Sequence, residues 1–265
     1  MGNFIAAVCG ICYIIGKQAD SKKTGIQERD VKLSEERKYM DIELNYCEQG
    51  TGFPLILLHG NGESLDYFSH QITYFSKSFR VIAVDTRGHG RSPRGERPFT
   101  ISQFAEDLRE FMDGLGIEKA HILGFSDGGN IALTFALRYP ERVERLVLNG
   151  ANLNPSGVKA HVQLPIVLGY RIASLFAGKS ADAKKNAELL GLMVNEPDIR
   201  PEELRGLQIK TLVIAGKKDM IKESHTRLIG ENLPAGQLEI IDGDHFIANK
   251  NPDEFNRVAE KFLIG

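Results

Sequence analysis

A serine lies at the centre of the motif Gly-Phe-Ser-Asp-Gly-Gly at residues 124–129, where it is Ser126. A short apolar run precedes the motif, and a helical pattern follows it from residue 130 to 138. At a sharp turn from a strand into a helix, small residues two positions before and after the centre relieve crowding and leave the central side chain accessible. The helix N-terminus also stabilises developing negative charge. The pattern therefore predicts a nucleophile elbow with Ser126 as the nucleophile.

A serine hydroxyl is a weak nucleophile, so it needs a base, and the base needs an acid that orients it. His245 and Asp219 each follow a short apolar run that is expected to form a strand. The carboxyl ends of parallel strands meet at one edge of a sheet, which is where open α/β sheets bind ligands. We predict that Ser126, Asp219 and His245 form a catalytic triad, in that chain order.

Other acids and histidines are weaker candidates. Asp242 and Asp244 compete with Asp219 as the acid, but neighbours on one loop rarely point at their own histidine. The loop at residues 149–152, which is another place for such an acid, contains none. The remaining histidines are expected to be structural or solvated.

The oxyanion of an acyl-transfer reaction needs two backbone N–H donors. Asp127 follows the nucleophile and is expected to supply one of them. Asn61, in the loop His59-Gly60-Asn61-Gly62, is expected to supply the other, because glycine on both sides lets the backbone turn this amide inward. We expect His59 to shape this loop through hydrogen bonds rather than to act as a base.

These groups would be positioned by alternating strands and helices. Residues 40–46 alternate between apolar and polar side chains and predict a half-buried first strand. Fully apolar runs, typical of parallel strands covered on both faces, follow at 54–58, 81–84, 122–123, 146–148, 212–215 and 238–241. The order predicts an α/β fold with a doubly wound, mostly parallel sheet.

Two helices carry clear start signals. The helix at 101–115 is expected to begin at a capping box of Thr100 and Gln103, and the last helix is expected to be capped by Asn251, with Pro252 in its first turn.

Residues 149–206 contain helical stretches but no convincing strand. We expect a short helical cap at about 150–206, inserted into a domain at 39–265. Apolar residues of this insertion would line an acyl pocket, pack the cap helices together, or do both.

The N-terminal part at residues 1–38 combines an apolar segment with a polar linker. Residues 4–16 carry no charge, but they are shorter than a membrane-spanning helix and no basic residue precedes them. We expect a short helix docked on the domain or an interfacial anchor. Cys9 and Cys12 form a C-x-x-C, but no second pair completes a zinc site.

The charge balance and the cysteine count of the chain exclude further classes of protein. The chain has 265 residues, with 33 Lys+Arg against 35 Asp+Glu, so no field of one sign is available to bind nucleic acid. Three cysteines are too few for a disulfide framework and favour a reducing compartment. We expect no metal, no organic cofactor and no nucleic-acid partner, and a cytoplasmic location. Membrane association through residues 4–16 stays open but is not favoured, and the oligomeric state is undetermined.

The motifs together resemble the α/β-hydrolase superfamily, in its small single-cap branch of esterases and lactonases. The resemblance rests on the loop at 59–62, the elbow at 124–128 and the turn Asp-Thr-Arg-Gly-His-Gly-Arg-Ser at 85–92, and it spans roughly residues 39–264. It implies the fold and a hydrolase activity but not the substrate. Dehalogenases and epoxide hydrolases of the superfamily carry aspartate at the elbow, so Ser126 argues against both.

The sequence thus favours a carboxylic ester hydrolase that acts on a small, partly apolar substrate through Ser126. The elbow is similar to that of valacyclovir-hydrolase-like enzymes, which would make Asp127 a binding residue for a substrate amine; alternatively, Asp127 only stabilises the helix dipole. Enol-lactone and carbon–carbon bond hydrolysis use the same triad and stay open. Two different alternatives are a ligand sensor with slow or no turnover and a membrane-associated lipid hydrolase.

Overall fold

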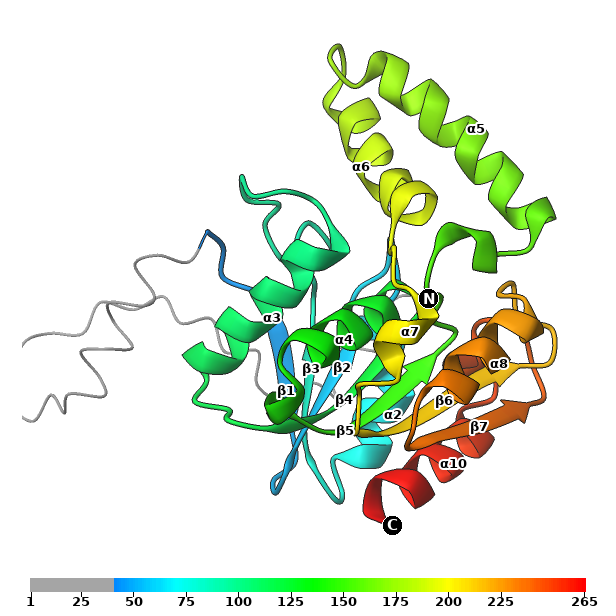
Figure 1. The fold of residues 1–265 in the computed structure, drawn as a ribbon. Helices are drawn as coiled ribbons and strands as arrows, with labels where there is room; N and C mark the ends of the chain where they lie inside the picture. The colour runs from blue at the N-terminus through cyan, green and yellow to red at the C-terminus, as the bar shows by residue number, and fades with distance from the viewer. Residues whose placement is uncertain (1–40) are drawn as a thin grey trace, which may run out of the picture.

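A seven-stranded sheet forms the centre of the computed structural model, which describes residues 41–265 (Figure 1). The strand order is β1-β3-β2-β4-β5-β6-β7; β1 is antiparallel to β3, and all other neighbours are parallel. This confirms the doubly wound, mostly parallel sheet. The strands are β1 (Tyr46–Gln49), β2 (Pro54–Leu58), β3 (Arg80–Val84), β4 (Ala120–Phe125), β5 (Val143–Asn149), β6 (Lys210–Gly216) and β7 (Gly236–Ile241).

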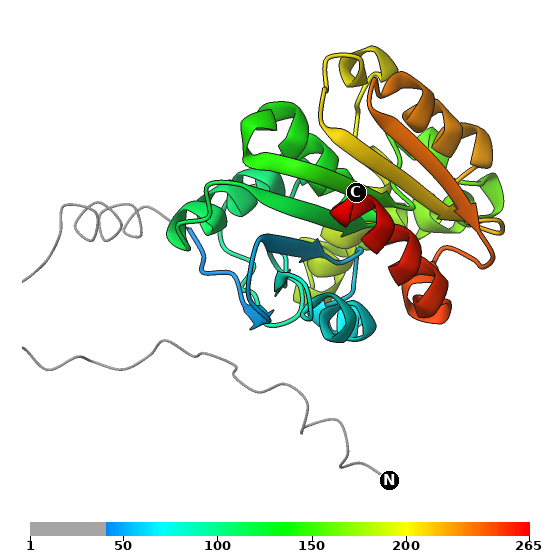
Figure 2. The same cartoon turned by 90° about the horizontal axis from the view of Figure 1, so that it is seen from below.

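Helices cover both faces of the sheet (Figure 2). One face packs on α3 (Ile101–Gly114), α4 (Asp127–Arg138) and α8 (Glu223–Asn232). The other packs on η1 (Leu65–Phe68), α2 (Ser69–Phe75), α9 (Ile247–Lys250) and α10 (Pro252–Ile264). Along β2, Leu55 and Leu57 enter the second core, and Ile56 and Leu58 enter the first. This strand is buried on both sides, which explains its unbroken apolar run.

The first strand begins later than the alternating pattern predicts. Residues 41–45 lie outside any strand, although Ile42 and Leu44 are buried, and residue 40 lies outside the described part. Polar groups here bond to the loop after β3 instead of to a neighbouring strand. The Asn45 N–H donates to Ser92 Oγ at 2.8 Å, and Asp41 accepts from backbone amides of the same loop. In residues 41–45, the alternation of apolar and polar side chains therefore indicates burial and not strand pairing.

The two expected helix caps differ from prediction in their details. Thr100 Oγ1 accepts from the Gln103 N–H at 3.1 Å, but the Gln103 side chain bonds to Asp107 instead of returning to the cap. The capping box is thus half formed. Asn251 makes no side-chain cap: its amide nitrogen donates to Glu254 at 2.7 Å and to a backbone carbonyl, and its side-chain oxygen accepts from no amide of the helix.

A helical hairpin separates β5 from β6 in the chain. It consists of α5 (Ala160–Phe176) and α6 (Ala181–Asn195), preceded by η3 (Pro155–Gly157) and followed by α7 (Pro201–Leu204). The hairpin projects away from the sheet, and α5 packs mainly on α6 (Figure 1). The expectations for residues 1–38, including Cys9 and Cys12, fall outside the described residues. Within residues 41–265, no helix has the length and apolar character needed to span a membrane.

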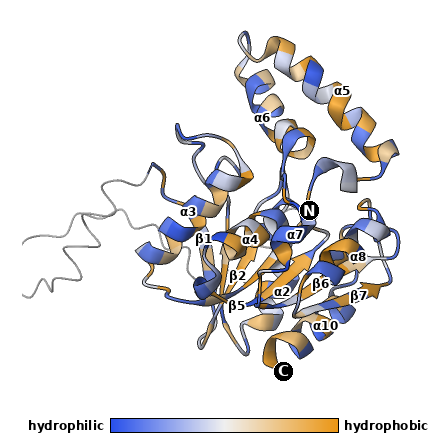
Figure 3. Ribbon diagram, viewed as in Figure 1, coloured by the Kyte–Doolittle hydropathy of each residue, from blue (hydrophilic) through white to orange (hydrophobic). Residues whose placement is uncertain are grey.

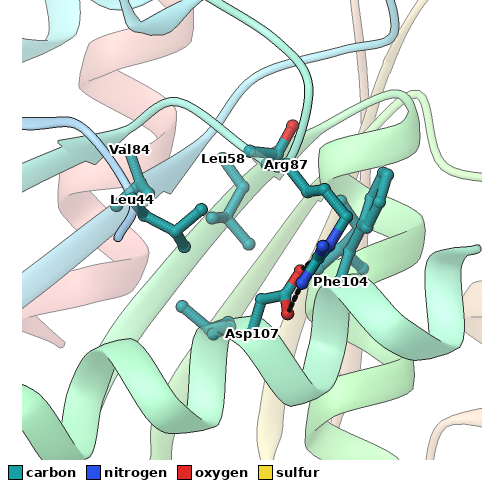
Figure 4. A pocket seen from close by; sticks show the side chains of 9 residues that line it. Leu44, Leu58, Val84, Arg87, Phe104 and Asp107 are labelled. Atoms are coloured by element: carbon teal, nitrogen blue, oxygen red, sulfur yellow. Dashed lines mark hydrogen bonds and ion pairs between the residues drawn. The ribbon is translucent and has the colours of Figure 1, made fainter. Parts of the chain in front are cut away.

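The loop after β3 is held by a buried ion pair. Arg87 donates two hydrogen bonds to Asp107, from Nε at 2.7 Å and from Nη2 at 2.6 Å, and its side chain is inaccessible to solvent. Arg87 also pairs with Asp41. A small internal cavity adjoins the pair and is lined by Leu44, Leu58, Val84, Thr86, Arg87, Phe104, Asp107, Leu108 and Ile131 (Figure 4). None of Ser126, Asp219 and His245 lines this cavity, so it belongs to the scaffold.

Candidate active site

Ser126 lies at a strained turn between β4 and α4. Its φ is 53° and its ψ is −120°, and it is the sole non-glycine residue with positive φ in the described chain. A Cβ on Gly124 would lie 2.2 Å from the Gly128 carbonyl oxygen, and one on Gly128 would lie 2.0 Å from the Leu58 carbonyl oxygen. Glycine is therefore required on both sides of Ser126. The surrounding backbone holds the strain, since the Ser126 N–H donates to Asn149 at 2.8 Å.

Ser126, His245 and Asp219 come together at the carboxyl edge of the sheet. His245 Nε2 lies 3.0 Å from Ser126 Oγ, and His245 Nδ1 lies 2.7 Å from Asp219 Oδ1. Because the carboxylate accepts from Nδ1–H, Nε2 is left free to accept the serine proton. Asp219 Oδ1 also accepts from the Ile221 N–H at 2.8 Å, which fixes the carboxylate. His245 and Asp219 are buried, whereas Ser126 is half-buried.

The competing acids point elsewhere. Asp242 forms an ion pair with Lys217 at 2.6 Å. Asp244 forms an ion pair with Lys250 and accepts from the Phe246 N–H. Both face outward from the loop that carries the histidine, so neither orients the imidazole.

Gly150 is a site residue that the sequence analysis missed. It follows β5 with φ +63°, and a Cβ there would lie 2.7 Å from His245 Cε1 and 3.3 Å from Asp219 Oδ2. A side chain at this position would displace the imidazole. Its position directly after an expected strand is visible in the sequence, but this position alone does not show that His245 packs against it.

The two expected oxyanion donors lie in the segments that follow two neighbouring strands of the sheet. Asn61 follows β2 and Asp127 follows β4, and these strands pair in register at Leu58 and Gly124. Within residues 41–265, neither the Asn61 nor the Asp127 backbone N–H donates to a protein acceptor. Two unpaired donors beside a nucleophile are what an oxyanion site needs.

His59 fixes the shape of the loop that carries Asn61. Its Nε2 accepts from the Thr86 N–H at 3.1 Å, so the proton resides on Nδ1, which donates to the Gly60 carbonyl at 2.7 Å. Burial lowers the pKa of His59, in the direction that favours the neutral ring required by these two hydrogen bonds. With both nitrogens engaged, His59 is not available as a general base.

Glu63 closes the same loop and was not found from the sequence. Its carboxylate accepts from the Gly60 N–H at 3.3 Å, and its own N–H donates to the Gly60 carbonyl at 3.3 Å. Burial raises the pKa of Glu63. The reciprocal pair holds the turn in which Asn61 presents its amide.

Two contacts tie the helical hairpin to the site. The Asn61 side chain donates from Nδ2 to the Leu189 carbonyl on α6 at 2.7 Å. Arg94, in the loop after β3, forms an ion pair with Glu188 on the same helix at 2.7 Å. The hairpin therefore sits over the loops that surround Ser126.

Asp127 carries a buried and only partly satisfied carboxylate. Oδ1 accepts from Asn130 Nδ2 at 3.1 Å, whereas Oδ2 has no hydrogen-bond partner. Burial raises the pKa of Asp127 to about 6, with a smaller contribution in the same direction from the negative charge of Glu196, while the Asn130 and Asn61 side-chain amides act to lower it. A group of this kind costs stability when it ionises.

Replacing Asp127 with asparagine should therefore stabilise the protein at high pH. The pKa rises from about 3.9 in the unfolded chain to about 6 in the native state. The native state then binds the proton more tightly, and wild-type stability falls as pH rises through this window, by up to about 3 kcal/mol. In urea unfolding, the free energy of unfolding of Asp127→Asn should exceed that of the wild type by about this amount at pH 8. The two values should match near pH 4. A difference independent of pH would contradict the assignment.

No group of three or more His, Cys, Asp or Glu residues suited to a metal ion occurs in the part of the chain that the structure describes. The groups brought together at the candidate site are the Ser126, His245 and Asp219 side chains, with backbone N–H donors around them.

Comparison with known proteins settles the family. Residues 54–171 match the family model described as alpha/beta hydrolase fold. The chain is 30% identical to a putative carbamate hydrolase RutD of Caulobacter sp. (strain K31), over 80% of this chain and 90% of the relative. The chain belongs to the α/β-hydrolase family.

Other α/β-hydrolase relatives have different substrates in their names. A 3-oxoadipate enol-lactonase 2 of Acinetobacter baylyi is 27% identical, over 84% of this chain and 94% of the relative. Among solved structures, a meta-cleavage product hydrolase of Pseudomonas fluorescens IP01 (CumD) is 29% identical with a TM-score of 0.69, covering 84% of this chain and 94% of its own. The relatives are hydrolases, which shows the esterase- and lactonase-like branch of the α/β-hydrolase family but not the bond cleaved.

Proposed function

We propose that this protein is a serine hydrolase that cleaves a carboxylic ester, or a related acyl bond, of a small and partly apolar substrate. The observation that carries the proposal is the continuous path from Ser126 Oγ to His245 Nε2 at 3.0 Å and from His245 Nδ1 to Asp219 Oδ1 at 2.7 Å. It begins at a serine held at positive φ on a helix N-terminus.

In the proposed reaction, Ser126 attacks the acyl carbon while His245 takes its proton. The Asn61 and Asp127 amides stabilise the oxyanion, and Asp219 stabilises the imidazolium. His245 then protonates the leaving alcohol, which departs from the acyl-enzyme. Water, activated by the same imidazole, releases the acid and restores Ser126.

The acyl bond is chosen from the chemistry that the relatives share. Carbamate, enol-lactone and meta-cleavage product hydrolases are all named among them. An ester is the simplest substrate for an acyl-enzyme route, and it needs no group beyond those already placed.

The first test is covalent labelling during turnover. The full chain should release p-nitrophenol steadily from short and medium acyl esters, and a fluorophosphonate should stop the reaction at one label per chain. Peptide mass spectrometry should place the label on Ser126. A label on another serine would contradict the proposal.

A sensor is the outcome that this test separates from an enzyme. If the folded protein turns over no ester in the panel but retains a bound ligand through long incubation, the pocket serves recognition rather than hydrolysis. Steady release of acid product would exclude a ligand sensor.

A second candidate is hydrolysis of esters that carry an amine, with Asp127 binding the ammonium group. The buried, unpartnered Oδ2 one residue after Ser126 favours it, because an amine would supply the missing partner. Asp127→Asn should then lower kcat/KM for an α-amino acid ester by about tenfold to a hundredfold and leave the matching ester without the amine nearly unchanged. Equal losses on both esters would argue against amine recognition.

A further inference from the structure

The helix α5 has two apolar faces, of which one is accounted for. That face packs on α6: a Cβ on Gly169 would lie 3.3 Å from a Leu190 methyl, and Tyr170 lies against Gly191. The Gln163 side chain donates to the Met193 carbonyl at 3.0 Å. This contact explains why the two helices form a hairpin, and it leaves the opposite face of α5 without a partner among residues 41–265.

The opposite face presents large apolar side chains to solvent. Their spacing of four, four and three residues places them along one side of the helix, with the last of them in the final turn. We call this set the α5 stripe: Leu164, Leu168, Ile172, Leu175 and Phe176, exposed by 68%, 60%, 51%, 76% and 52%. They are five of the eight exposed large apolar side chains in residues 41–265. Such a concentration marks a binding surface rather than scattered surface residues. Figure 3 shows orange segments along α5, which stands clear of the sheet.

The charges around the α5 stripe are mainly basic. Arg171 lies beside the stripe on α5, and Lys179 lies at the tip of the hairpin, just past the last stripe residue. Lys184 and Lys185 lie near the start of α6, where Lys185 shares its face with Glu188 and Leu192, which contact the domain. All four are exposed, and none forms an ion pair within the described residues. Across residues 160–187, Asp182 is the only acidic residue against these four. The tip of the hairpin therefore carries positive charge that no acidic residue within 41–265 pairs with.

The geometry points to docking of the hairpin on an anionic lipid surface, with the α5 stripe entering the interface and the basic residues contacting headgroups. Helices that lie in a membrane interface combine an apolar face with basic residues at its edge in this way. A second copy of the chain fits less well, because a symmetric contact would bring two basic hairpins together. The hairpin is also the part of the described fold that projects furthest from the sheet, so it can reach a flat surface without obstruction (Figure 1). The inference does not depend on the proposed ester hydrolysis.

Vesicle flotation with the full chain tests this inference. We expect binding to vesicles of three parts phosphatidylcholine to one part phosphatidylserine, and weaker binding to phosphatidylcholine alone. Leu168→Asp/Leu175→Asp should reduce partitioning by about tenfold or more. Arg171→Glu/Lys179→Glu, at the two basic residues that adjoin the stripe, should abolish the preference for phosphatidylserine, and added salt should weaken wild-type binding.

Matched controls lie on the last helix, at Ile264 and Lys261, which are both exposed. Ile264→Asp and Lys261→Glu should bind as wild type does, and thermal melts should show that every variant folds. Absence of wild-type binding would overturn the inference. Binding that both hairpin variants retain would also overturn it, because another segment, such as residues 4–16, would then hold the membrane. Self-association in solution that Leu168→Asp/Leu175→Asp abolishes, without vesicle binding, would assign the stripe to a second copy instead.

Discussion

Ser126→Ala and His245→Ala should each lower kcat for a p-nitrophenyl ester by about 10⁵- to 10⁶-fold. Ser126 Oγ lies 3.0 Å from His245 Nε2, and in the proposed reaction the two side chains act as one unit. The double variant should therefore lose no more than either single one. Steady-state rates of the three variants and the wild type measure this directly.

The control for these variants is Ser78→Ala, which removes an exposed serine hydroxyl far from the elbow in sequence. It should retain wild-type kcat. Losses that multiply in the double variant would mean that Ser126 and His245 act independently. Wild-type activity in Ser126→Ala would mean that another group is the nucleophile.

Asp107→Ala should lower the free energy of unfolding by about 3–5 kcal/mol. The Arg87 side chain has no solvent access, and Asp107 accepts two of its hydrogen bonds. Without Asp107, part of a buried guanidinium charge loses its partner, which costs more than the pair contributes. Urea unfolding monitored by circular dichroism measures the loss.

Two further variants make this result specific. Arg87→Met/Asp107→Leu removes both fully buried charges and should recover much of the lost stability, because Asp41, which also loses its partner Arg87, is partly exposed and keeps its backbone donors. Glu223→Ala breaks an exposed ion pair with Arg227 and should change stability by less than about 1 kcal/mol. Equal losses in Asp107→Ala and Glu223→Ala would contradict the role given to burial.

The elements that local constraints determine could be predicted from the sequence. The run at 54–58 coincides with β2, because a strand covered on both faces has no polar positions. The elbow could be predicted because Gly124 and Gly128, each two residues from Ser126, are needed to avoid clashes with nearby backbone carbonyls. The candidate triad residues could be proposed because strand ends of a parallel sheet converge, whatever the rest of the chain does.

The features that depend on contacts distant in the chain could not be predicted. Gly150 carries no chemistry, and its importance appears only when His245 is seen against it. The α5 stripe has the same apolar pattern as a core helix, because periodicity identifies faces but not what covers them. Asn251 has the residue type of a cap, but Glu254 competes for its side chain.

The bond from the Asn61 side chain to α6 has a consequence for how such a protein can diversify. Its acceptor is the main-chain carbonyl of Leu189, which every amino acid at that position would also provide. This link to the Asn61 loop therefore tolerates a change of side chain at position 189, whereas the Arg94–Glu188 ion pair depends on the side chain at position 188. A shift of the helix axis would break the Asn61 bond, so this contact constrains the backbone of α6 and not the residue type at position 189.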